Sequence, residues 1–69
     1  MRSITGREFA RILERRGWTL LRVNGSHHIY GHSGNQARIS LPIHGNTPLK
    51  TGLLRHLARI ADIEEEELR

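Results

Sequence analysis

The sequence has no cysteine, so neither a disulfide bond nor a thiolate metal site can stabilise this chain or take part in its chemistry. Aromatic side chains are also scarce, with one Phe, one Trp and one Tyr in 69 residues. No apolar run approaches the roughly 20 residues that span a bilayer, and the N-terminus lacks the apolar region of a secretory signal. We therefore expect a soluble, cytoplasmic protein with no membrane partner. Residues 1–69 should form one domain, too small for a large enclosed active site.

Acidic side chains are rare outside the C-terminus. Residues 1–59 contain ten basic side chains and two acidic ones, a net charge of +8, whereas residues 60–69 carry a net charge of −4. Ten of the eleven cations are arginine, whose planar guanidinium suits phosphate better than the lysine ammonium does. The charge predicts a nucleic acid or an acidic protein as partner, although a basic composition can also serve solubility alone.

The first predicted element is a helix over residues 5–16. Thr5 and Glu8 fit a capping box, in which each side chain receives a hydrogen bond from the other residue's backbone N–H. Apolar residues recur at helical spacing on one face, and Gly17 is expected to end the helix.

Three short strands are predicted next, because β-forming residues alternate with turn signals. The strands cover residues 18–23, 27–32 and 37–43, with turns at 24–26 and 33–36. Two short turns make the sheet antiparallel.

A second helix is expected to open with Thr47 as its cap and Pro48 at its first position. Asp62 is a candidate cap for a short final helix over residues 63–68. The predicted fold is α+β with the order α-β-β-β-α: a three-stranded antiparallel sheet, two helices packed on one face and a short C-terminal helix. The other face of the sheet is then left in solvent.

The side chains of that open face follow from strand alternation. Ile29 is expected to point inward, so His28 and Tyr30 project from the open face, and Arg38 and Ser40 join them from the third strand. The same reasoning puts His27 on the side of Ile29, nearer the helices, so we assign it no chemistry. The predicted RNA-binding residues are Arg22, Tyr30, Arg38 and Ser40.

Five histidines are the main candidates for chemistry. His28 and His32 are four residues apart, a spacing that suits metal binding on a helix and not on a strand, and no carboxylate near the strands completes a site. We therefore expect no metal and no cofactor. A histidine can instead act as a general acid or base, since its unperturbed pKa of about 6.5 lies near neutral pH. Composition alone favours the plainer interpretation of His28 as a polar surface residue.

Several motifs instead favour a catalytic role for His28. The segment from Gly25 to His28 resembles the Gly-Ser-x-His signature of the HicA toxins, the mRNA interferases of bacterial and archaeal toxin–antitoxin pairs. Residues 41–45 resemble the Pro-x-His step of that family, and residues 49–55 resemble the start of its second helix. The resemblance extends over essentially the whole chain in the same order.

The resemblance implies a fold similar to a double-stranded-RNA-binding domain and a metal-independent endoribonuclease that cleaves mRNA. His28 matches the catalytic histidine of the family. Four further positions match with supporting roles. Gly25 is expected to form the turn, and Ser26 to fix the backbone or contact RNA. His44 and Lys50 are expected to contact the phosphate or another part of the substrate. It also implies a HicB-type antitoxin that covers the catalytic histidine, with DNA bound only through that antitoxin.

Two other functions stay open from the residues themselves. One is a non-catalytic RNA-binding domain on the same scaffold, which should carry a lysine cluster at the start of its second helix to reach phosphates. Only Lys50 is found there, which favours the enzyme. The other is an interaction module whose basic surface serves only a protein partner.

Overall fold

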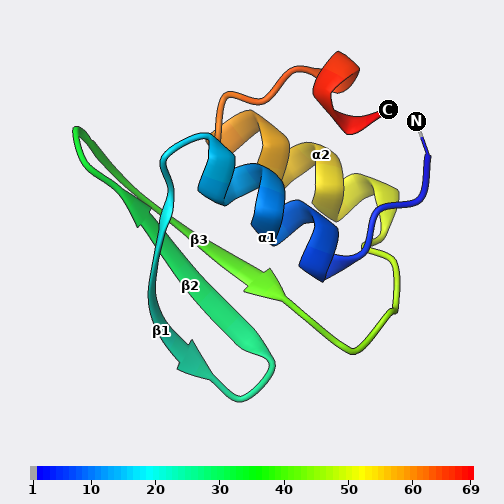
Figure 1. The fold of residues 1–69 in the computed structure, drawn as a ribbon, viewed down its shortest axis with the longest axis horizontal. Helices are drawn as coiled ribbons and strands as arrows, with labels where there is room; N and C mark the ends of the chain where they lie inside the picture. The colour runs from blue at the N-terminus through cyan, green and yellow to red at the C-terminus, as the bar shows by residue number, and fades with distance from the viewer. Residues whose placement is uncertain (1) are drawn as a thin grey trace.

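The fold is a three-stranded antiparallel sheet with both helices on one of its faces (Figure 1). The computed structural model describes residues 2–69, and its strands lie in the order β1-β2-β3. The C-terminal turn packs over the helices. The architecture confirms the predicted α-β-β-β-α fold. Its elements are α1 (Gly6–Arg15), β1 (Thr19–Asn24), β2 (His27–His32), β3 (Asn35–Pro42), α2 (Thr51–Ile60) and a 3-10 turn (Glu65–Leu68).

Helix α1 begins as predicted. The Glu8 N–H donates to Thr5 Oγ1 at 3.1 Å, and the Thr5 N–H donates to Glu8 Oε1 at 2.9 Å, which completes the capping box. The hydrogen bond from the Thr5 backbone, followed by that from the Arg2 guanidinium, lowers the pKa of Glu8. Gly17 follows the helix with φ of +91°, a left-handed conformation that glycine adopts without strain.

Helix α2 starts later than predicted. Thr47 and Pro48 do not open the helix, which begins at Thr51 with Lys50 as its N-cap. Pro48 instead pairs with Thr5 in an antiparallel bridge, and the adjoining Leu49 N–H donates to the Ile4 carbonyl at 2.7 Å. This pairing holds Pro48 and Leu49 against the chain before α1, an interaction that no local signal could reveal.

The C-terminal helix is also shorter than predicted. Asp62 does not cap it: this residue has φ of +58° and ends α2, and a 3-10 turn follows from Glu65 with Glu64 as its N-cap. The Arg16 guanidinium ties the turn to the end of α1, because it pairs with the Glu67 carboxylate and donates to the Asp62 carbonyl at 3.0 Å. The acidic tail is therefore packed against the body of the protein.

The sheet presents a different set of β2 side chains to the helices from the set predicted. Tyr30 is buried at 2% exposure and pairs across the sheet with Ile39, which is itself fully buried. Ile29 pairs with the exposed Ser40 and lies half-buried on the open face. The prediction that Ile29 points inward and Tyr30 outward is wrong, because the aromatic ring fills the space between β2, β3 and the helices.

Gly6 packs closely against the end of β3, and its replacement tests that packing. A β-carbon at this position would lie 2.5 Å from the Pro42 carbonyl oxygen and 2.9 Å from Ile43 Cγ1. We expect Gly6→Ala to destabilise the protein by about 1–3 kcal/mol, because backbone must shift to admit the methyl group.

The matched control is Gly52→Ala, where a β-carbon meets nothing within 4 Å. This substitution on helix α2 should stabilise the protein by about 0.5–1 kcal/mol through helix propensity. Thermal unfolding of both variants gives the comparison, and equal Tm shifts of the same sign would contradict the packing at Gly6.

Candidate functional site

Two adjacent histidines on β2 face opposite sides of the sheet. His28 pairs with Leu41 and therefore shares the helix-covered face with this fully buried leucine. His27 pairs with Pro42 on the other face, where its Nδ1 lies 3.2 Å from Ser40 Oγ. The predicted placement of the two is thus reversed, since it depended on the inward orientation of Ile29.

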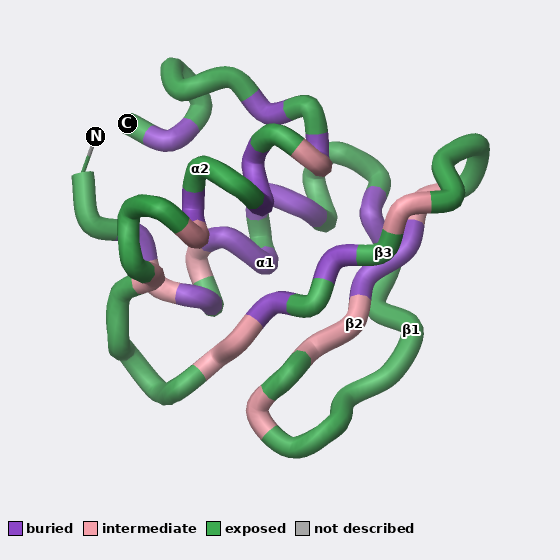
Figure 2. Tube along the Cα trace, turned by 180° about the vertical axis from the view of Figure 1, so that it is seen from behind, coloured by how far each residue is buried: buried purple, intermediate pink, exposed green. Residues whose placement is uncertain are grey.

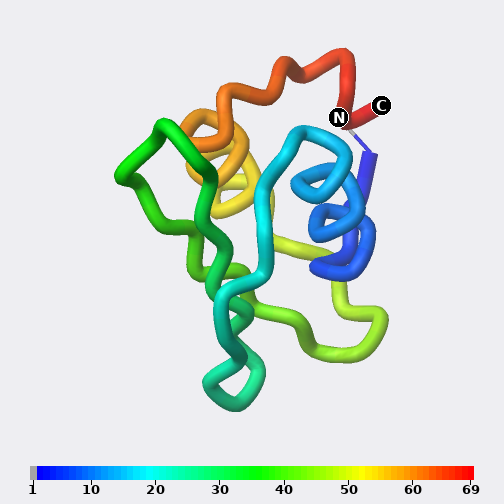
Figure 3. The backbone as a smooth tube through the Cα atoms, turned by 60° about the vertical axis from the view of Figure 1, so that its left-hand side comes forward, coloured from blue at the N-terminus to red at the C-terminus, as the bar shows by residue number. Residues whose placement is uncertain are grey.

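His28 lies where the cover of the helices ends. Its partner on β3 is buried, but its partner on β1 is Val23, which is 48% exposed. The turn that precedes β2 projects beyond the helical layer (Figure 3). His28 is half-buried, and its imidazole makes no hydrogen bond to any of residues 2–69. Both ring nitrogens can therefore form hydrogen bonds with a bound molecule.

The turn before His28 is held in place by the end of β3. Gly25 has φ of +60°, which this tight turn requires and which glycine adopts readily. The Ser26 carbonyl accepts a hydrogen bond of 2.9 Å from the Ile43 N–H, one residue beyond β3. This contact aligns the beginning of β2, and with it both histidines, against the segment that leads to His44.

His44 and Lys50, which are six residues apart in the chain, line one hollow. Its volume is about 210 Å³, and Pro42 and Leu53 contribute to its apolar wall. Lys50 is also the N-cap of α2, where no side chain caps the first backbone N–H groups. An ammonium group beside free N–H groups at a helix N-terminus favours an anion. The structure thus brings two of the predicted support residues together, although His28 is not among the residues that line this hollow.

The other predicted RNA-binding residues lie apart from His28. Arg22 pairs with Ile29 and so shares the open face with Ser40 and His27. Arg38 lies on the same face, where its guanidinium covers Gly31 and donates to backbone carbonyls of its own strand. Arg22, Arg38 and Ser40 therefore lie on the same face as His27, and the sheet separates them from His28.

Tyr30 is not an exposed aromatic residue, and the prediction that places it on the RNA-binding face is wrong. Its ring belongs to the core, and burial, followed by the nearby Glu14 carboxylate, raises the pKa of its hydroxyl. What the prediction missed is the His27–Ser40 pair, which the alternation of β2 would have revealed had Tyr30 been recognised as the core residue.

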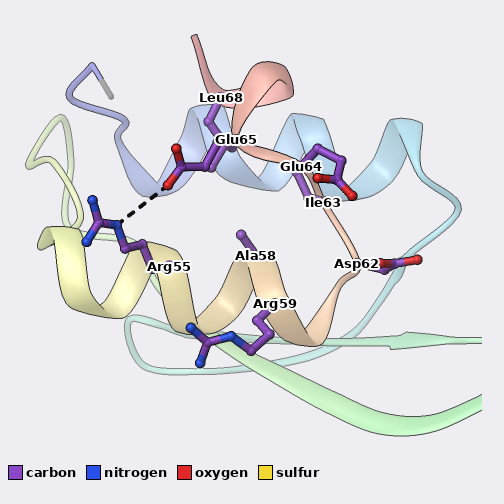
Figure 4. Close-up of a pocket in the computed structure, with 8 residues that line it drawn as sticks. All are labelled: Arg55, Ala58, Arg59, Asp62, Ile63, Glu64, Glu65 and Leu68. Atoms are coloured by element: carbon purple, nitrogen blue, oxygen red, sulfur yellow. Dashed lines mark ion pairs between the residues drawn. The ribbon is translucent and has the colours of Figure 1, made fainter.

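Another hollow lies elsewhere, between α2 and the C-terminal turn (Figure 4). Its volume is about 300 Å³, and the Arg55 Nε lies 3.8 Å from Glu65 Oε1 across it. None of the predicted site residues lines it. This hollow lies between the acidic tail and the basic helix α2, and it is separate from the histidine site.

Neither a metal site nor a membrane helix is seen in the part of the chain that the structure describes. No three histidine, aspartate or glutamate side chains among residues 2–69 gather closely enough to hold a metal ion. No helix within these residues is both long and apolar enough to cross a membrane.

These features define a small basic α+β protein of α-β-β-β-α order with an accessible histidine near the end of its sheet. The family described as HicA toxin of bacterial toxin-antitoxin matches residues 6–63, which run from the start of α1 to just beyond α2. The chain belongs to the HicA toxin family and is therefore a toxin of a toxin–antitoxin pair. A comparison with curated proteins found no match.

Proposed function

We propose that this toxin is an endoribonuclease that cleaves mRNA and that His28 carries the catalysis. The observation that supports this most is the family match, which includes the whole Gly-Ser-x-His segment from Gly25 to His28. The site agrees with it, because His28 is accessible at the margin of the helices and has no hydrogen-bond partner among residues 2–69. A shallow site at the margin of the helices suits a flexible single strand and needs no deep pocket.

The proposed reaction uses the RNA's own 2′-hydroxyl as the nucleophile. The 2′ oxygen attacks the adjacent phosphorus while a base removes its proton, and the bond from phosphorus to the 5′ oxygen breaks as that oxygen gains a proton. The products are a 2′,3′-cyclic phosphate and a 5′-hydroxyl. His28 performs one of the two proton transfers, and Lys50 stabilises the charge on the phosphate.

His44 is the first candidate for the second proton transfer. It lies at the hollow that also contains Lys50, so an imidazole and an ammonium group are both available to one phosphate there. The Ser26–Ile43 hydrogen bond joins this segment to the turn that leads to His28. Gly25 and Ser26 therefore serve the site by setting the position of the turn.

The chemistry predicts cleavage that survives the removal of divalent metal ions. Wild-type protein incubated with a defined RNA in excess EDTA should cut at the rate seen without the chelator, since imidazole and ammonium groups supply every proton and charge. The products should carry 2′,3′-cyclic phosphate ends. Chelator sensitivity would contradict the metal-free mechanism, and 5′-phosphate ends would contradict attack by the 2′-hydroxyl. RNA binding without cleavage would instead favour a binding domain.

The proposed partner is a HicB-type antitoxin that binds over the basic surface and denies RNA access to His28. Residues 1–59 carry a net charge of +8, so the contacting surface of such an antitoxin should be acidic. Binding to DNA then belongs to the complex, through the antitoxin. Both proteins would act in the cytoplasm, where the mRNA substrate is found.

A further inference from the structure

Three arginines form a stripe along the outer side of α1. Arg7, Arg11 and Arg15 recur every four residues, and all three are exposed. At a rise of 1.5 Å per residue the stripe is roughly 12 Å long. It runs opposite the buried side of the helix, which includes Phe9 and Leu13. We call these three residues the α1 arginine stripe.

No ion pair among residues 2–69 includes an arginine of the α1 arginine stripe. The ion pairs within residues 2–69 involve other arginines, at positions 2, 16 and 55. Of the two acidic residues on α1, Glu8 is engaged by the Thr5 backbone and by Arg2. Glu14 lies near the Tyr30 hydroxyl, toward the sheet. Three guanidinium groups are therefore available to an anionic partner.

The composition of the stripe suits a polyanion better than it suits a protein. Arginine is enriched at protein interfaces too, but there it accompanies an apolar interface core, and the stripe itself contains no apolar side chain. Exposed arginines without apolar partners are typical of contacts to nucleic-acid phosphates. The exposed large apolar side chains lie on β1, on a different element: they are Leu20, Leu21 and Val23. Figure 2 shows β1 exposed along its length. The α1 arginine stripe thus lies on a different element from these exposed apolar side chains, and its own exposed side chains are all cationic.

The position of the stripe connects it to the histidine site. Arg7 at its N-terminal end follows Gly6, which packs directly against the Pro42 carbonyl and Ile43. Pro42 pairs with His27 and lines the hollow that contains His44. A nucleic-acid strand bound along the stripe toward Arg7 thus reaches the end of β3, where the histidine site lies.

We propose that the α1 arginine stripe binds the sugar-phosphate backbone of single-stranded RNA and guides it to the site, an inference that rests on the proposed ribonuclease function. The contacts are to phosphates and so carry no sequence preference. They should add to affinity for the substrate without contributing to bond cleavage.

The test is a triple variant, Arg7→Gln, Arg11→Gln and Arg15→Gln, with glutamine chosen for its similar helix propensity. Its binding to a 2′-O-methyl RNA strand, which cannot be cleaved by 2′-hydroxyl attack, is measured by fluorescence anisotropy between 50 and 200 mM salt. We expect affinity to fall on the order of tenfold at the lower salt concentration, because up to three phosphate contacts are lost. The slope of log K against log salt should become shallower by about 2, at about 0.7 per contact.

The matched control removes three arginines that lie outside α1. Its substitutions are Arg55→Gln, Arg59→Gln and Arg69→Gln. It changes the net charge equally, so an equal loss of affinity would assign the effect to overall charge and overturn the proposal. Arg11→Gln alone should lower the slope by about 0.7 and provides the measurement if the triple variant does not fold. Wild-type affinity and slope in the stripe variants would also overturn the proposal, and loss of antitoxin binding in that case would assign the stripe to the antitoxin.

Cleavage kinetics separate this inference from the proposed function. The stripe variant should cut cleavable RNA with a raised KM and an unchanged kcat, because binding and chemistry use different residues. A lower kcat at unchanged KM would overturn the guiding role. If the wild type binds RNA through the stripe but cleaves none, the proposed ribonuclease function fails and the binding surface stands.

Discussion

Replacing His28 with alanine is expected to reduce RNA cleavage by a factor of about 10²–10⁴, the usual contribution of one general acid or base. His27→Ala should cleave at close to the wild-type rate. The two residues are adjacent on β2 and chemically identical, yet they lie on opposite faces of the sheet. His27→Ala is therefore a matched control for His28→Ala.

The comparison requires single-turnover cleavage of a defined RNA at saturating protein. Circular dichroism and thermal unfolding of both variants confirm that the fold is retained, which we expect because neither imidazole belongs to the core. Undiminished cutting by His28→Ala would reject the assignment. If His27→Ala loses activity and His28→Ala does not, the chemistry lies on the open face with Ser40, Arg22 and Arg38.

Tyr30→Ala is expected to lower the free energy of unfolding by about 3–5 kcal/mol, the range for buried aromatic side chains. Tyr30 is 2% exposed and contributes to the core between the sheet and the helices. A domain of this size has little stability to lose, so the variant should be largely unfolded at room temperature. Ile29→Ala, one residue away on the open face, should cost only about 1 kcal/mol.

Urea unfolding of the two variants and of Tyr30→Phe measures this difference. The phenylalanine variant keeps the ring in the core and removes only the hydroxyl group near Glu14, so it should stay close to the wild type. A larger loss from Ile29→Ala than from Tyr30→Ala would mean that the helices cover the other face of β2. That result would also move His28 to the open face.

Much of the fold follows from signals between near neighbours in the chain. The Thr5–Glu8 capping box acts over three residues, and Gly25 supplies the left-handed conformation of its turn. Such interactions are decided by local backbone geometry, which explains why α1 and the β1–β2 turn match their predictions. The start of α2 does not, because the pairing of Pro48 with Thr5 joins segments more than forty residues apart.

The face that each β2 side chain adopts is a second non-local result. Alternation divides a strand into two sets of residues, but both sets of β2 contain an apolar side chain, Ile29 in one and Tyr30 in the other. The choice between them depends on the partners across the sheet. Tyr30 is opposite the buried Ile39, whereas Ile29 is opposite Ser40.

The sequence by itself determined the order of the elements, the excess of arginine and the Gly-Ser-x-His motif that ends at His28, because these depend on residue identity and short spacing. Only the tertiary structure decided that His28 lies on the covered side of the sheet, apart from Arg38 and Ser40. It alone brought His44 and Lys50 to one hollow. The physical reason is that strand register and helix packing are set by burying the most apolar surface at once, a property of the whole chain.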